Sequence, residues 1–92
     1  MKYHVYLIIT LRKSRYVTYV GYSKNIKKRI DLHNSSKGAK FTKGNYWILI
    51  YKKSYNSKKN AIKAEYMLKK NHKLRTELKK KYLDENSSTT TL

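Results

Sequence analysis

The sequence contains no cysteine, and this absence excludes three kinds of site at once. Disulfide bonds, thiolate zinc sites and cysteine nucleophiles all need a sulfur atom that the 92-residue chain does not have. No apolar run approaches the roughly 20 residues of a membrane-spanning helix. The first residues also lack the apolar stretch of a secretory signal peptide. We therefore expect a cytoplasmic (nucleoid) or nuclear protein that is not secreted.

Acidic residues are also scarce, and the resulting charge imbalance points to a polyanionic partner. Five Asp and Glu stand against 23 Lys and Arg, which gives a formal net charge of +18. Such a charge repels itself and is typical of proteins that bind nucleic acid or an anionic surface. A membrane surface is the weaker candidate, because no long apolar segment accompanies the charge. The composition therefore predicts nucleic-acid binding.

Three runs rich in β-branched and aromatic residues predict strands. They cover residues 3–10, 16–22 and 46–55. The first two lie close enough in the chain to form an antiparallel hairpin. If its turn centres on Arg12 and Lys13, the hairpin places Tyr6 directly opposite Tyr19.

Three further segments show helical periodicity, and Ser23 and Ser57 are the predicted N-caps of the first two. They cover residues 24–34, 58–71 and 73–83. The fold class is therefore α/β (α+β), with a three-stranded antiparallel sheet flanked by helices in the order ββαβαα. Residues 1–83 would form the single domain, and residues 84–92 a polar, disordered tail.

Glu65 is the side chain that this fold explains least. It falls within the apolar stripe that Ala61, Ala64 and Leu68 form on the second helix. Burying an unpaired carboxylate is costly, so such a group needs a cation, a metal or an arginine beside it. A single carboxylate completed by water and phosphate suits Mg²⁺. The alternative is an ion pair of Glu65 with Arg29 or a lysine on a partly exposed helix.

Arg29 and His33 stand four residues apart, so their side chains meet on one face of the first helix. A guanidinium binds phosphate in bidentate fashion and offsets charge that develops at phosphorus. An imidazole can move a proton or orient a tyrosine hydroxyl. The alternative is that His33 packs against the sheet and Arg29 makes an ordinary phosphate contact.

Taken in order, these positions resemble the GIY-YIG nuclease family, in its small single-domain form. The resemblance spans roughly residues 3–75. Over this range the chain is similar to the nuclease domains of excision repair and of structure-specific resolvases. Five features carry it: His4-Val5-Tyr6, Tyr19-Val20-Gly21, the arginine helix over 25–34, the loop over 36–44, and Ala64-Glu65-Tyr66. The chain departs from the family where His4 replaces the first glycine. It also departs at Tyr22, where some relatives carry a lysine whose task Lys24 could take over.

The resemblance implies a metal-dependent endonuclease for DNA, in preference to RNA, that selects structures and not sequences during repair or recombination. Glu65 would hold Mg²⁺, with Mn²⁺ able to substitute, and Tyr6 or Tyr19 would position and deprotonate the attacking water. Arg29 would stabilise the charged transition state, while His33 would orient the tyrosine or accept its proton. Phosphate contacts are expected from Lys24, Lys37, Lys40, Lys43, Lys69 and Lys70.

Two alternatives to an enzyme remain open at this point. One is a non-catalytic module that binds DNA or RNA and retains the nuclease fold, and the other is a basic protein that compacts DNA. Neither needs tyrosines arranged around a glutamate, so the residues favour an enzyme. A protein partner or a homodimer would then supply specificity that so small a domain lacks.

Overall fold

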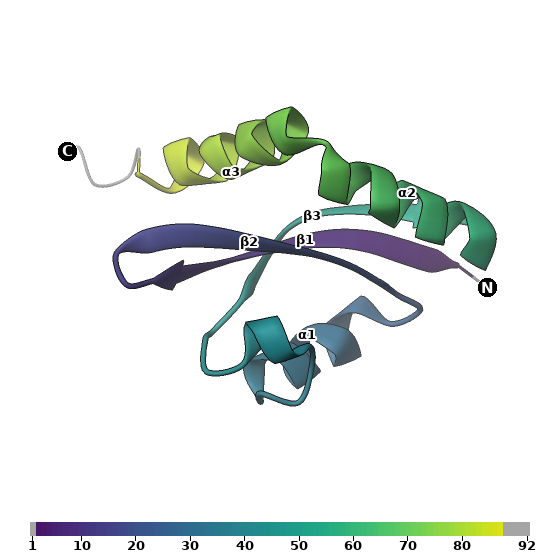
Figure 1. The fold of residues 1–92 in the computed structure, drawn as a ribbon, viewed down its shortest axis with the longest axis horizontal. Coiled ribbons are helices and arrows are strands. Elements are labelled where there is room, and N and C mark those ends of the chain that lie inside the picture. The colour runs from purple at the N-terminus through teal and green to yellow at the C-terminus, as the bar shows by residue number, and fades with distance from the viewer. Residues whose placement is uncertain (1, 88–92) are drawn as a thin grey trace.

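The structure, a computed structural model, describes residues 2–87. Three strands and three helices follow one another in the order ββαβαα, which confirms the predicted fold class. The elements are β1 (Tyr3–Arg12), β2 (Arg15–Ser23), α1 (Ile26–Asn34), the short 3₁₀ turn η1 (Lys40–Thr42), β3 (Ile48–Tyr55), α2 (Lys58–Lys70) and α3 (His72–Ser87). The antiparallel sheet has the order β2-β1-β3, with α2 and α3 on one face and α1 on the other (Figure 1).

The central strand β1 is apolar along most of its length because both of its faces are covered. Val5 and Leu7 point toward α2 and pack with Ala61 and Leu68. The alternate side chains, among them Tyr6, point toward α1 and pack with Trp47 and others. A strand buried on both faces reads as a continuous apolar run without alternation, as seen here.

The β1–β2 hairpin turns over two residues, and its register differs from the prediction. Arg12 pairs with Arg15, so the turn consists of Lys13 and Ser14, both with positive φ (49° and 66°). Such two-residue turns match the twist of the flanking strands and are usually built from Asn or Gly, which this turn lacks. The predicted pairing of Tyr6 with Tyr19 is therefore wrong. Tyr6 lies opposite Gly21, and both strands extend further toward the turn than expected.

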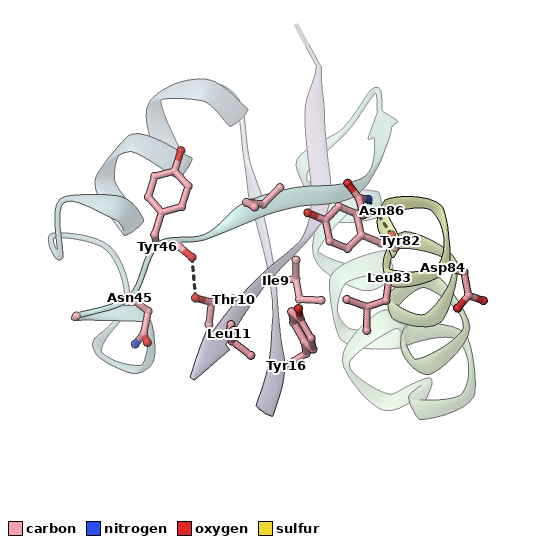
Figure 2. A pocket seen from close by; sticks show the side chains of 12 residues that line it. Ile9, Thr10, Leu11, Tyr16, Asn45, Tyr46, Tyr82, Leu83, Asp84 and Asn86 are labelled. Carbon is pink, nitrogen blue, oxygen red and sulfur yellow. Dashed lines mark hydrogen bonds between the residues drawn. The ribbon is translucent and has the colours of Figure 1, made fainter. Parts of the chain in front are cut away.

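Side chains of α1 and β1 hold the segment between α1 and β3 in place through hydrogen bonds to its backbone. Asn34 accepts a hydrogen bond from the Trp47 amide (2.6 Å) and donates one to the Trp47 carbonyl (3.1 Å). The Thr10 hydroxyl donates to the Tyr46 carbonyl at 2.6 Å (Figure 2). β3 consequently begins at Ile48, two residues after the predicted start. The predicted basic loop also contains the 3₁₀ turn η1.

Helix boundaries agree best where a serine cap is followed directly by the helix. Ser57 caps α2 as predicted and accepts from the Asn60 amide at 3.1 Å. For α1 the cap is Asn25 and not Ser23, whose hydroxyl instead bonds the Asn25 backbone. The boundary between the last two helices is set by Asn71, which accepts from the Leu74 amide at 3.0 Å.

The third helix differs from its predicted span at both ends. It begins at His72 and continues to Ser87, so the first part of the predicted tail is helical. The rest of that tail lies outside the described residues. No helix in the described range, 2–87, is long and apolar enough to cross a membrane.

Candidate active site

The site is organised around the pairing of Tyr6 with Gly21. Tyr6 projects from the central strand toward α1, and its side chain is 1% exposed. A Cβ atom at position 21 would overlap the hydroxyl end of the Tyr6 ring. Gly21 therefore provides the space in which the Tyr6 hydroxyl sits, and this gives the glycine of Tyr19-Val20-Gly21 a physical role.

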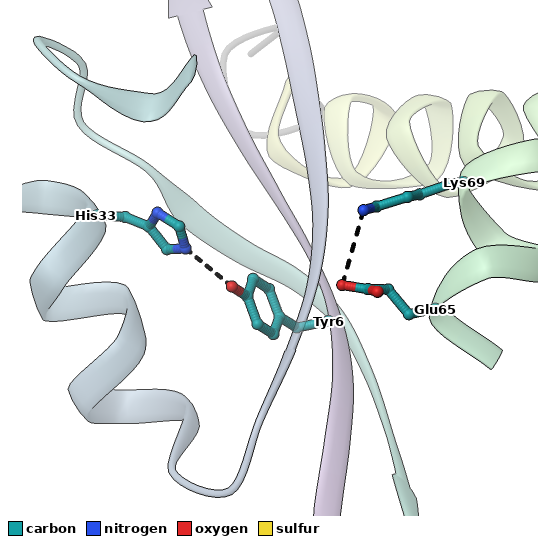
Figure 3. A network of polar contacts seen from close by, with 4 residues as sticks. All are labelled: Tyr6, His33, Glu65 and Lys69. Atoms are coloured by element: carbon teal, nitrogen blue, oxygen red, sulfur yellow. Dashed lines mark hydrogen bonds and ion pairs between the residues drawn. The ribbon is translucent and has the colours of Figure 1, made fainter. Parts of the chain in front are cut away.

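A chain of hydrogen bonds runs inward from the Tyr6 hydroxyl. Its oxygen lies 2.8 Å from Nε2 of His33 (Figure 3). Nδ1 of His33 lies 2.9 Å from the Thr42 hydroxyl. Thr42 donates its proton to the Ala39 carbonyl at 2.8 Å, so its oxygen accepts from Nδ1–H. Nε2 is then left as an acceptor, and Tyr6 must donate to it. The network assigns neutral His33 as the Nδ1–H tautomer.

The electrostatics of this pair favour its neutral form. Burial raises the pKa of Tyr6 to about 12, although the charge of Arg29 and a hydrogen bond from its side chain act to lower it. Tyr19 and Glu65 act in the same direction as burial. Burial also lowers the pKa of His33, and the neighbouring Arg29 charge adds to that effect. The Tyr6 hydroxyl is thus influenced by groups from α1, β2 and α2 together.

Tyr19 lies on the same face of the sheet as Tyr6 but remains open to solvent on one side. Its ring meets the His33 ring edge-on (centroids 5.4 Å apart) and stacks on Phe41 (6.0 Å). It is half-buried and lines a hollow of about 350 Å³ together with Lys69 of α2. Of the two tyrosines, Tyr19 is therefore the one that water can reach.

Glu65 approaches from the other side of the sheet, on α2. Its side chain is 18% exposed and forms an ion pair of 3.8 Å with Lys69. Figure 3 shows its carboxylate directed toward the strands, across from Tyr6 and His33. The predicted burial is only partial, and the alternative of a lysine partner is what the structure shows.

Among the described residues no group of three or more His, Asp or Glu could hold a metal by itself. A single accessible carboxylate nevertheless fits Mg²⁺, which retains several waters and often binds through one or two carboxylates and substrate oxygens. The ion pair with Lys69 is long, so it leaves the carboxylate oxygens of Glu65 available.

The family model of the GIY-YIG catalytic domain matches residues 2–82. The chain belongs to the GIY-YIG family. This is a nuclease family, so membership implies binding of nucleic acid. A UPF0213 protein of Bacillus licheniformis is 35% identical over 89% of this chain and 80% of its own length. The UPF0213 protein YazA of Bacillus subtilis is 34% identical over 89% of this chain and 79% of its own length.

A solved relative is the UPF0213 protein BH0048 from Bacillus halodurans, whose structure was determined by solution NMR. It is 33% identical to this chain, and the match covers 84% of this chain and 80% of that one with a TM-score of 0.45. The names of these relatives state no activity.

Arg29, the predicted phosphate-stabilising residue, lies on the wall of a basic hollow. Arg29 lines a cavity of about 510 Å³ with Lys24, Lys28 and Lys58. None of the described residues that line it is acidic. This hollow brings the predicted phosphate ligand Lys24 next to Arg29, where an anionic group would find several donors.

The other predicted phosphate ligands are spread over the surface. Lys37, Lys40 and Lys43 are exposed on the segment between α1 and β3. Lys69 is paired with Glu65, and the Lys70 ammonium lies 4.6 Å from the centre of the Tyr66 ring. None of these five lysines lines the hollow that contains Arg29, whereas Lys24 does.

Two residues of the GIY-YIG site could not be identified from the sequence. Thr42 is fully buried and fixes the His33 ring, yet it stands nine positions away in a loop that reads only as basic. A Cβ at Gly38 would collide with the His33 ring, so this glycine lets the loop pass over the imidazole. Both act through contacts across a loop, which no short spacing pattern reveals.

Proposed function

We propose that this GIY-YIG domain is a metal-dependent endonuclease that hydrolyses phosphodiester bonds in DNA. We propose further that it selects structure and not sequence, and that it acts in repair or recombination. The observation that carries the proposal is the arrangement around Tyr6. His33 of α1 lies 2.8 Å from the Tyr6 hydroxyl on one face of the sheet, and the carboxylate of Glu65 on α2 is directed toward the strands from the other face (Figure 3). A fold that needed only charge for binding would not require this arrangement.

Tyr19 is the group we assign to the attacking water. A general base must come within hydrogen-bond reach of the proton that it removes. Tyr6 is fully buried, already donates to His33 and has a pKa raised to about 12, all of which oppose such a role. Tyr19 opens onto the hollow that it shares with Lys69. As the phenolate, Tyr19 orients the water there and takes its proton, which returns the side chain to the neutral hydroxyl form.

Tyr6 and His33 are positioning residues in this account. The Tyr6 hydroxyl donates a hydrogen bond to His33 and is close enough to Arg29 for the guanidinium charge to lower its pKa against the effect of burial. Arg29 in turn lines the basic hollow with Lys24 and Lys28. A phosphodiester bound in this hollow would meet Arg29 where negative charge develops in the transition state.

Glu65 is the residue that would hold the metal. When bound, Mg²⁺ or Mn²⁺ would supply Lewis-acid stabilisation of the phosphate oxygens. Lys69, the present partner of Glu65, lines the same hollow as Tyr19 and can turn to a substrate phosphate. Lys24, Arg29 and Lys69 would contact phosphates, and such contacts position a substrate without reading its sequence, which supports selection by structure.

A non-catalytic binding module is the alternative, and the Glu65–Lys69 ion pair is the observation that favours it. The test is incubation of the purified protein with labelled branched, nicked and duplex DNA and with single-stranded RNA. Each substrate is combined with Mg²⁺, Mn²⁺ or EDTA. The proposal predicts cleavage of DNA that requires the divalent ion and is greatest on one branched or nicked form. Salt-sensitive binding with no cleavage in any condition would identify a binding module.

A further inference from the structure

Three neighbouring hollows of the surface, which we call the track, share lining residues of the outer strand β2. The hollow at Tyr19 shares Thr18 and Arg75 with a second hollow of about 420 Å³ beside the hairpin turn. The second shares Tyr16 with a third hollow of about 790 Å³ at the far end of the sheet. The track therefore leads from Tyr19 back along the strand to Tyr16. We call the first two hollows the trench and the third the tyrosine pocket.

The walls of the trench are basic. Its cationic residues are Arg12, Lys13, Arg15, Lys69, Arg75 and Lys79. None of the described residues that line it is acidic. A surface hollow with cations on both walls and no carboxylate is suited to a chain of phosphates and not to a protein segment of mixed charge.

One side of α3 lines the whole track. Arg75, Lys79, Tyr82 and Asn86 recur at intervals of three and four residues, so they share one helical face. Leu74 and Leu78, on a neighbouring face of α3, pack against the hydrophobic core. The part of α3 near Tyr19 is cationic, whereas its far end lines the third hollow with Tyr82, Asp84 and Asn86.

Two of the arginines in the trench donate hydrogen bonds to backbone carbonyls and still have N–H groups available for a ligand. Arg75 donates to the carbonyls of Leu68 and Lys69 at the end of α2 (3.1 and 3.0 Å). Arg12 donates to the Phe41 carbonyl at 2.8 Å. A guanidinium has five N–H donors, so both can bind a phosphate as well. Arg15 is exposed, and Lys79 faces it across the same hollow.

The tyrosine pocket offers flat aromatic surface to solvent. Tyr16 is 45% exposed and Tyr46 is 71% exposed, and Tyr82 forms part of the same lining (Figure 2). Leu11 and Ile48, both substantially exposed, complete an apolar floor. Aromatic side chains beside a basic groove are the usual means of binding single-stranded nucleic acid, because every base has a face that can stack.

We propose that the trench binds a single strand of nucleic acid leading away from the reaction site, and that an unpaired base stacks on Tyr16 in the tyrosine pocket. This inference rests on the proposed function in that it takes nucleic acid as the substrate. It adds a substrate class, namely DNA with a single-stranded extension. A base can enter the pocket only when it is free of its complement.

The test measures equilibrium binding in EDTA, so that it does not depend on cleavage. Fluorescence anisotropy compares a blunt duplex with duplexes that carry a 5′ or a 3′ extension of roughly eight nucleotides. The inference predicts tighter binding of one of the extended duplexes. The double variant Arg15→Gln/Lys79→Gln should lose this advantage. Its log–log salt slope should fall in magnitude by about 1.4, at about 0.7 for each phosphate contact to a single strand.

Two controls isolate the trench from general charge and from folding. Lys59→Gln/Lys80→Gln removes the same charge at exposed sites outside the trench and should keep the preference for the extension. Tyr16→Ala should weaken binding of the extended duplex about tenfold without changing the salt slope, while Tyr16→Phe should bind as the wild type does.

The inference is overturned if neither extension improves binding, or if the two double variants behave alike. Cleavage is scored separately on the same proteins. If the wild type cleaves DNA but the trench variants bind the extended duplex as the wild type does, this inference alone is rejected. Trench-dependent binding without cleavage would reject the proposed function alone.

Discussion

The buried hydroxyl of Tyr6 donates a hydrogen bond to Nε2 of His33 across 2.8 Å. The direction of this bond is set on the far side of the ring, where the Thr42 hydroxyl accepts a hydrogen bond from Nδ1 and donates one to the Ala39 carbonyl. Thr42 therefore sets the tautomer of His33 and, through it, the direction of the hydrogen bond from Tyr6.

Replacing Thr42 with valine tests this relay. The variant leaves Nδ1 of His33 buried without an acceptor, which should lower the free energy of unfolding by about 1–3 kcal/mol. The imidazole ¹⁵N shifts, which report the Nδ1–H tautomer in the wild type, should change, and cleavage should slow. Thr42→Ser keeps the hydroxyl and should restore all three properties. Unchanged ring shifts in Thr42→Val would show that Thr42 does not set the tautomer.

The two tyrosines should respond differently to loss of the hydroxyl. Tyr19→Phe removes the group assigned to the attacking water and should lower kcat by about 100-fold or more. Tyr6→Phe removes a positioning contact and should cause a smaller loss. Single-turnover cleavage rates of both variants, at saturating substrate, make the comparison. A larger effect of Tyr6→Phe would reverse the assignment.

His33 should make the free energy of unfolding decrease as the pH falls below about 6.5. In the unfolded chain the imidazole takes up a proton near its ordinary pKa of 6.5, whereas burial and Arg29 lower its pKa in the folded protein. Below that pH the unfolded state binds more protons, so the free energy of unfolding falls as the pH falls. Thermal melts from pH 8 to pH 5 should show a steeper decline for the wild type than for His33→Gln. His72→Gln, at an exposed position, should decline as the wild type does.

Gly21→Ala should disturb the site from the opposite strand. The new methyl group would overlap the end of the Tyr6 ring, so the ring must shift or the strands separate, at a cost of about 1–3 kcal/mol. The cost should be smaller in a Tyr6→Leu background, because the hydroxyl oxygen and the ring carbon that bears it, the two atoms that the added carbon would overlap, are then absent. Denaturant melts of the two single variants and the double variant measure the coupling. Strictly additive effects would mean that residue 21 does not touch Tyr6.

Element order and type could be predicted from the sequence because they depend on local patterns. The apolar run of β1, the Ser57 cap of α2 and the periodicity of the helices all lie within short windows. Register could not be predicted in the same way. It depends on a two-residue turn in which Lys13 and Ser14 both adopt positive φ. Neither residue type favours this conformation, so the sequence does not indicate where the turn lies.

The site shows the same division between local and long-range information. Arg29 and His33 could be paired from their helical spacing, and Glu65 could be singled out as an acid among apolar neighbours. The Glu65–Lys69 ion pair also follows from a spacing of four residues within α2, whereas the position of Glu65 across the sheet from His33 depends on how α2 packs. The trench joins the hairpin turn to α3, segments far apart in the chain, so no local pattern contains it.

The central claim is that Glu65 takes part in the reaction and does not merely pair with Lys69. The most direct measurement compares Glu65→Gln with Glu77→Gln, which changes the charge equally at an exposed site on α3. Cleavage of the preferred DNA with Mg²⁺ and binding of the same DNA in EDTA are recorded for both variants. The account predicts that Glu65→Gln loses cleavage and keeps binding, while Glu77→Gln keeps both. Cleavage by Glu65→Gln at the wild-type rate would contradict it.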